Sequence, residues 1–177
     1  MAKLDSGLYY ISKGLPYAIS SKNDELITKF IIEKSALHFL QNDFSDGIKQ
    51  LKQADAYLSK VSSPELLTKY LNWNARFYEA LHKSDSSMYY YHASEQVNEK
   101  YNPYDNWVVY YNMAQMFKRA EAYDESEKYF IKAYALTKPK GIRMDHVTVL
   151  VEFADLCYLT KKAGQFASLL DEQQKMM

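Results

Sequence analysis

Small side chains recur along this chain at a fixed spacing, and that spacing limits the possible folds more than any other feature of the sequence. One series is spaced by 40, 39 and 40 residues and consists of Ser35, Ala75, Ala114 and Ala154. A second series lies twelve residues after the first three of these and consists of Gly47, Ser87 and Ser126. Large residues follow the second series after four positions, at Leu51, Tyr91 and Phe130. Small residues follow after three more positions, at Ala54, Ser94 and Ala133.

Small residues in this pattern are typical of a close crossing between two antiparallel helices. Helices approach each other tightly only where small side chains meet, and large apolar or aromatic residues then fill the space beside the crossing. A single pair of helices cannot bury its apolar face, so stacked neighbours must complete the core. We therefore predict an all-α fold, a right-handed α-solenoid of about four antiparallel helix pairs with a period of about 40 residues.

The repeat predicts where helices begin and end along a single domain over residues 1–177. The expected pairs cover residues 24–59, 64–100, 104–138 and 143–176, with component helices at 24–41 and 44–59, 64–82 and 85–100, 104–119 and 123–138, and 143–161 and 164–176. Prolines, which break helices, fall at the joints between pairs: Pro64, Pro103 and Pro139. The last pair is irregular, because Phe166 replaces the small residue and Gly164 indicates a turn about three residues late.

The first twenty residues match the second half of a repeat. The segment from Asp5 to Tyr10 parallels the segment from Asp85 to Tyr90, at an offset of 80 residues or two periods. Gly7, Ile11 and Gly14 then occupy the small, large and small positions of a second helix. We therefore expect residues 1–20 to form an orphan second helix that precedes the four pairs, and the chain to be a fragment of a longer protein.

The best copy of the repeat lies between Tyr110 and Ala133. It reads Tyr110-x-x-Met113-Ala114-x-x-Phe117, then Tyr123-Asp124-Glu125-Ser126, then Phe130-x-x-Ala133, and it resembles the tetratricopeptide (TPR) family. This resemblance implies stacked helical hairpins that bind protein partners. The period exceeds the family's usual length of about 34 residues, which implies longer helices or joints. Glu121 replaces the glycine that the family carries in the hairpin turn.

The segment from Asp85 to Tyr91 shows a second, narrower resemblance. Together with its weaker copy from Asp5 to Tyr10 and the 40-residue period, it is similar to TPR regions attached to bacterial sensor histidine kinases and helix-turn-helix transcription regulators. In such proteins the repeats sense or bind a partner while a separate module acts. The resemblance therefore implies the sensing or interaction region of a bacterial signalling protein.

Composition speaks against several other functions. Lysine plus arginine (22) equals aspartate plus glutamate (22), so the chain lacks the long-range field that attracts nucleic acid or anionic lipid. No apolar run approaches the roughly 20 residues of a membrane-spanning helix. We expect no nucleic-acid partner and no membrane insertion of this segment, while the compartment stays open.

The sequence contains no recognisable catalytic or cofactor motif. Neither G-x-x-x-x-G-K-[ST] nor G-x-G-x-x-G occurs, and no histidine belongs to H-E-x-x-H or to a zinc-type cluster. His92 and Glu95 share a helical face, although an exposed pair is a simpler interpretation than two metal ligands. A nucleophilic pair of Cys157 and His146 would make the chain a hydrolase, but no flanking signature supports it. We predict that the chain is not an enzyme and that it binds no cofactor and no metal.

The TPR resemblance also implies where a partner binds. First helices of this family line a concave groove with residues at offsets −6, −3, +1 and +4 from the small residue, which share one helical face. The partner-binding residues expected on that basis are Lys69, Asn72, Arg76, Glu79, Tyr111, Gln115, Lys118, Asp155 and Tyr158. The first pair instead offers Lys29, Ile32, Ala36 and Phe39, which are apolar after the first member.

A polar groove flanked by tyrosines suits an extended peptide or a helix, so we expect a protein or peptide partner. The alternative is a structural or oligomerisation spacer whose groove has no specific ligand. We also expect self-association through uncapped ends, because exposed apolar faces promote association. The expected faces comprise Leu4, Leu8, Ile11 and Leu15 at one end, and Phe166, Leu169 and Leu170 at the other.

The repeat register predicts the effect of enlarging a crossing residue. Replacing Ala114 with phenylalanine should lower the free energy of unfolding by about 1–3 kcal/mol or prevent folding, because overpacking a tight crossing forces the helices apart. Thermal denaturation followed by circular dichroism measures the change. An unchanged melting temperature would show that Ala114 does not lie at a crossing.

Overall fold

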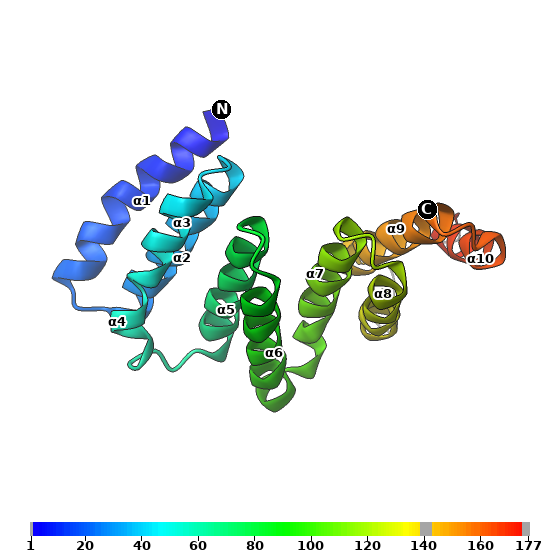
Figure 1. The fold of residues 1–177 in the computed structure, drawn as a ribbon. Coiled ribbons are helices and arrows are strands. Elements are labelled where there is room, and N and C mark those ends of the chain that lie inside the picture. Colours follow the sequence, from blue (N-terminus) through cyan, green and yellow to red (C-terminus); the bar gives the residue numbers. More distant parts are fainter. Residues whose placement is uncertain (1, 139–142, 175–177) are drawn as a thin grey trace. The chain divides into compact units, whose positions relative to one another are not determined.

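The computed structural model describes residues 2–138 and 143–174, and in this part of the chain helices joined by short loops are the regular structure, with no strand (Figure 1). The helices are α1 (Ala2–Ser20), α2 (Asp24–Leu40), α3 (Phe44–Lys52), α4 (Asp55–Leu58), α5 (Pro64–Ala80), α6 (Ser84–Tyr101), the 3₁₀ helix η1 (Pro103–Asp105), α7 (Asn106–Arg119), α8 (Tyr123–Thr137), α9 (Met144–Leu159) and α10 (Ala163–Gln174). The predicted all-α repeat fold is confirmed. The chain forms two compact units, which we call unit 1 (Met1–Tyr101) and unit 2 (Asn102–Met177).

Consecutive helices pack in pairs within each unit. In unit 1, α2 packs against α3 and α5 against α6, and α1 packs against α2. In unit 2, α7 packs against α8 and α9 against α10, while α8 also contacts α9. The second helix α8 therefore contacts both its own first helix and the next one, as stacking requires.

The small residues of the repeat are buried at the helix crossings. Ser126 shows the geometry most directly, because its Oγ donates a hydrogen bond of 2.9 Å to the carbonyl oxygen of Ala114. Gly47 lies against the ring of Phe77, and a Cβ atom at this glycine would come within 2.4 Å of Phe77 Cε1. The buried members of the series include Ser35, Ala75, Ala114, Ala154, Ser87, Ser126, Ala54, Ser94 and Ala133. The regular spacing of small residues in the sequence therefore marks the positions at which the helices cross.

The same backbone turn joins the two helices of each pair. Its central residue adopts a left-handed conformation, with φ of 60° at Asn42, 57° at His82, 58° at Glu121 and 57° at Lys161. The next backbone N–H then donates to the carbonyl oxygen five residues earlier, as from Ala122 to the oxygen of Phe117 at 3.0 Å. This Schellman motif satisfies carbonyl groups at the helix end. Glu121 thus adopts the conformation for which the family uses glycine, at a cost of roughly 1–2 kcal/mol.

Two expectations about helix boundaries are wrong. The helix expected at residues 44–59 is interrupted after Lys52, because Ala54 N–H bonds to the oxygen of Leu51, three residues back, and tightens the turn. The turn of the last pair is not displaced, since Lys161 follows Ala154 by the same seven residues that separate Glu121 from Ala114. Pro139 and the side chain of Phe166 lie outside the residues that the structure describes.

Helix α1 packs against α2 in the manner expected of a second helix. Ile11 and Ala18 are buried, and a Cβ atom at Gly14 would lie only 2.3 Å from the ring of Phe30. Leu15 is half-buried against the core of unit 1. Ile11 and Leu15, which we expected on an uncovered apolar face at the end of the chain, therefore face α2. The side chains of Leu4, Leu8 and Leu170 lie outside the described part, and Leu169 is buried in unit 2.

Two glycines provide a matched test of the packing. Replacing Gly47 with alanine should destabilise the chain by about 1–3 kcal/mol, because the new methyl group overlaps the buried Phe77 ring. The same change at Gly164 in α10 should stabilise it by about 0.5–1 kcal/mol, because nothing lies within 4 Å and alanine favours helix. Urea denaturation measures both. Equal effects at the two positions would contradict this account of the crossing.

Candidate binding surfaces

In unit 1, an arginine packs against two aromatic rings contributed by neighbouring first helices. The guanidinium carbon of Arg76 lies 4.6 Å from the ring centre of Phe39 on α2 and 4.5 Å from that of Trp73 on α5. The two rings are in contact, with centres 5.5 Å apart. Sequence reasoning selected Arg76 and Phe39 for this face and missed Trp73. We call these three residues the stacked arginine cluster.

The other expected residues of α5 point in different directions. Asn72 Nδ2 donates to Ser94 Oγ of α6 at 3.0 Å, and Glu79 accepts a hydrogen bond from the Tyr91 hydroxyl of α6 at 3.3 Å. Both side chains therefore tie α5 to its second helix. The Oδ1 atom of Asn72 is buried and has no hydrogen-bond partner in the described part of the chain.

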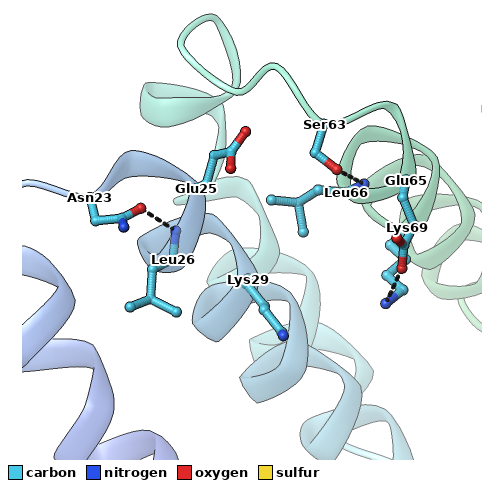
Figure 2. Close-up of a pocket in the computed structure, with 8 residues that line it drawn as sticks. All are labelled: Asn23, Glu25, Leu26, Lys29, Ser63, Glu65, Leu66 and Lys69. Carbon is cyan, nitrogen blue, oxygen red and sulfur yellow. Dashed lines mark hydrogen bonds and ion pairs between the residues drawn. The ribbon is translucent and has the colours of Figure 1, made fainter.

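A cavity of about 320 Å³ lies between the first turns of α2 and α5 (Figure 2). Its lining consists of four pairs of residues that are each 40 positions apart, namely Asn23 with Ser63, Glu25 with Glu65, Leu26 with Leu66, and Lys29 with Lys69. Asn23 and Ser63 cap the two helices by accepting backbone N–H bonds from Leu26 at 3.0 Å and from Leu66 at 3.2 Å. The cavity therefore follows from the repeat itself.

The charged groups of this cavity differ in their partners. Lys69 forms an ion pair of 3.0 Å with Glu65, and both side chains are exposed. Glu25 accepts a hydrogen bond of 3.1 Å from the backbone N–H of Ser62. Lys29 forms no ion pair with a residue that the structure describes. An exposed pair such as Lys69 with Glu65 contributes little to stability, so its lysine can exchange partners readily.

In unit 2, the expected residues of α7 and α9 come together around one lysine. Lys118 Nζ lies 3.1 Å from a carboxylate oxygen of Glu152 and also donates to Asp155. Gln115 Nε2 donates to Glu152 at 2.6 Å and to the Tyr111 hydroxyl at 3.3 Å. Sequence reasoning selected four of these five residues and missed Glu152. We call the five the Lys118 cluster. Tyr158, also expected on this face, is exposed on α9.

At the centre of the Lys118 cluster, burial and the neighbouring carboxylates shift the pKa of Lys118 in opposite directions. Burial by itself would lower the pKa of Lys118, but its hydrogen bonds to Asp155 and Glu152 outweigh burial and raise the pKa. Burial, together with the charge of Glu152, raises the pKa of Tyr111. Lys118 therefore stays protonated near neutral pH, and two carboxylates face one ammonium group. This cationic side chain already has its counter-ions inside the unit.

The two residues that sequence reasoning missed occupy equivalent positions. Trp73 lies two residues before Ala75, and Glu152 lies two residues before Ala154. The offsets taken from the family did not include this position. In both units it touches the face of a neighbouring first helix, so the repeat register could have identified it.

The structure contradicts the remote alternative of a nucleophilic pair of Cys157 and His146. Cys157 and His146 are both buried in α9, eleven residues apart, which corresponds to about 16 Å along the helix axis. His146 Nδ1 instead lies 3.1 Å from Thr137 Oγ1, and burial raises the pKa of Cys157. His92 and Glu95 do meet at 3.0 Å. In the described residues, no group of three or more metal-ligating side chains forms, and no helix is long and apolar enough to cross a membrane.

Paired antiparallel helices, small residues at the crossings and Schellman turns define the TPR-like helical-repeat solenoid fold. Comparison with solved structures supports this assignment of the fold. BtubC (BKLC) from P. vanneervenii superposes with a TM-score of 0.76 at 14% identity, over 96% of this chain and 71% of its own. The nearly identical TPR-like repeats of a candidate kinesin light chain from Podosopora anserina superpose with a TM-score of 0.69 at 11% identity, over 99% of this chain and 87% of theirs. A single-substitution variant of that protein gives a TM-score of 0.71 over the same shares.

No family model and no curated protein matches the sequence. At identities of 11–14%, the structural neighbours show the fold alone. What this chain binds must therefore be argued from its own surfaces.

The Lys118 cluster predicts a measurable coupling between α7 and α9. A double-mutant cycle with Lys118→Met and Asp155→Asn should give a coupling energy of about 0.5–1 kcal/mol, because Lys118 is mostly buried while Asp155 is exposed. Adding salt should reduce it, since exposed charges are screened. Urea denaturation of the four proteins at low and high salt provides the measurement. A coupling energy of zero would mean that this ion pair does not hold the two helices together.

Proposed function

We propose that the chain is a binding module for a protein or peptide, and that the ligand lies on the first helices of unit 1. The observation that carries the proposal is the stacked arginine cluster of Phe39, Trp73 and Arg76. Arginine and tryptophan are the residues that most often dominate binding energy at protein interfaces. The TPR-like fold supports the same function, because such repeats present extended surfaces to partners.

The stacked arginine cluster suits a carboxylate or a backbone carbonyl group. A guanidinium group packed face-on against aromatic rings keeps its N–H groups in the plane, where they can bind an oxygen acceptor. The rings also restrict the side chain before binding, which reduces the entropy that the complex must lose. An aliphatic or aromatic side chain of the ligand can pack beside these partly buried rings.

The cavity between α2 and α5 extends this surface along the helices. Lys69 precedes Arg76 by seven residues, or two helical turns, which corresponds to about 10 Å. Lys29 stands at the equivalent position of α2. An extended segment a few residues long can therefore reach from the arginine to the lysines. The preferred ligand is a peptide with acidic residues and at least one apolar residue.

Unit 2 is less suited to an acidic ligand. The ammonium group of Lys118 already faces Glu152 and Asp155, so an incoming carboxylate would meet two others. This observation favours the second candidate for unit 2, a structural spacer that holds the repeats in place. We propose that the chain acts by binding and catalyses no reaction. Its resemblance to repeats of bacterial signalling proteins supports a sensing or interaction role in such a protein.

Tryptophan fluorescence tests the proposal directly. A Trp107→Phe variant keeps Trp73 as its sole tryptophan, because the chain contains two. We expect synthetic acidic peptides that contain one leucine or phenylalanine to change the Trp73 emission, and basic peptides of matched length to have no effect. Adding Arg76→Ala should weaken binding at least about tenfold, which corresponds to roughly 1.4 kcal/mol.

Lys118→Met is the matched control, because it removes a cation from unit 2 and leaves the stacked arginine cluster intact. It should bind the acidic peptides as the parent does. Circular dichroism establishes that the Arg76→Ala variant still folds. Equal binding by the Arg76→Ala and parent proteins, or failure of every acidic peptide, would reject this surface and favour the spacer.

A further inference from the structure

Two second helices, α6 and α8, carry a tyrosine that stacks on their own first helix. Tyr90 of α6 stacks on Tyr78 of α5, with ring centres 5.4 Å apart and planes within 8°. Tyr129 of α8 stacks on Phe117 of α7, at 5.6 Å and 5°. Both tyrosines lie three residues after the small residue of their helix, Ser87 or Ser126. The stack is thus a repeated contact between the two helices of a pair.

A lysine reinforces this contact in unit 2. Lys132 lies three residues after Tyr129, and its ammonium group is 5.1 Å from the Tyr129 ring centre. It also lies 4.9 Å from the ring centre of Tyr110 on the first helix α7. This side of a second helix therefore receives aromatic rings from the helix that it packs against.

Helix α1 has the same residues on the same side. Counting from Gly7, Tyr10 corresponds to Tyr90 and Tyr129, and Lys13 corresponds to Lys132. Tyr17 continues this side two turns after Tyr10. We call Tyr10, Lys13 and Tyr17 the α1 outer face. Tyr10 is 71% exposed and Tyr17 is 70% exposed, whereas Tyr90 and Tyr129 are partly buried. No helix in the described part of unit 1 covers the α1 outer face, since α2 packs on a different side of α1, through Ile11 and Ala18. These two residues directly follow Tyr10 and Tyr17 and therefore lie about 100° around the helix from them.

We propose that the α1 outer face binds the α1 outer face of a second copy of this chain. A two-fold axis perpendicular to α1 makes the two helices antiparallel, which is also the direction of a first helix against its second helix. With the axis between residues 13 and 14, Tyr10 of one copy lies opposite Tyr17 of the other. Each Lys13 then lies near the tyrosine rings of the other copy, as Lys132 lies near Tyr110.

The composition of the face supports a second copy as its occupant. The contact needs a helix that offers aromatic rings two turns apart, and α1 itself is such a helix. The chain has a net charge of zero, so no long-range repulsion opposes association. The two-fold arrangement buries the α1 outer face of each copy, and association should therefore stop at a dimer.

Analytical ultracentrifugation over a range of protein concentrations tests this proposal. The parent chain should show a reversible equilibrium between monomer and dimer. The double variant Tyr10→Ser, Tyr17→Ser should raise the dimer dissociation constant at least tenfold. The control Tyr89→Ser, Tyr158→Ser removes two tyrosines that are each 69% exposed elsewhere, and it should dimerise as the parent does.

A cross-link gives an independent measurement. In a Cys157→Ser background, Lys13→Cys places the sole cysteine close to the two-fold axis, and mild oxidation should give covalent dimers. Tyr89→Cys in the same background should give none at equal concentration. A strictly monomeric parent, association beyond the dimer, or equal behaviour of the test and control variants would each overturn the proposal.

Discussion

Close approach of paired helices at small residues is the contact on which the rest of this structure depends. Where α7 crosses α8, the Ser126 hydroxyl reaches the carbonyl oxygen of Ala114, which is possible only because no larger side chain separates the helices. The same proximity brings rings beside the crossing into contact, as with Tyr129 on Phe117. It also determines the rotation of each helix about its axis, and hence which residues of the first helices face outward together.

Although the two units share this scaffold, they carry different chemistry on equivalent faces. The position two residues before the small residue holds Trp73 in unit 1 and Glu152 in unit 2. Trp73 supports Arg76 from one side, whereas Glu152 binds Lys118 and Gln115. One difference in the repeat thus places an aromatic ring beside the cation of unit 1 and a carboxylate beside the cation of unit 2. This difference is the reason for assigning binding to unit 1.

Much of the fold could be predicted from the sequence, and less of the candidate site. Helical phase follows from residue spacing, so Arg76, Gln115, Lys118 and Asp155 could be assigned to one face before the structure was known. Asn72 and Glu79 share that face but bond to α6, because Ser94 and Tyr91 offer polar partners within reach on the adjacent second helix. The break after Lys52 was also missed, since no proline or glycine marks it.

The all-helical repeat, its register and the residues at the crossings could be predicted from the order of residues alone. These properties depend on the size of side chains at a regular spacing, which a linear sequence records directly. The partners of the charged groups depend on the packing of the folded chain, because Lys118 and Glu152 are 34 residues apart and meet through the packing of separate helices. The folded structure also decided that Cys157 and His146 lie too far apart to react, and that Tyr10 and Tyr17 are exposed while Ile11 is buried. Spacing assigns a residue to a face, but only packing determines what that face touches.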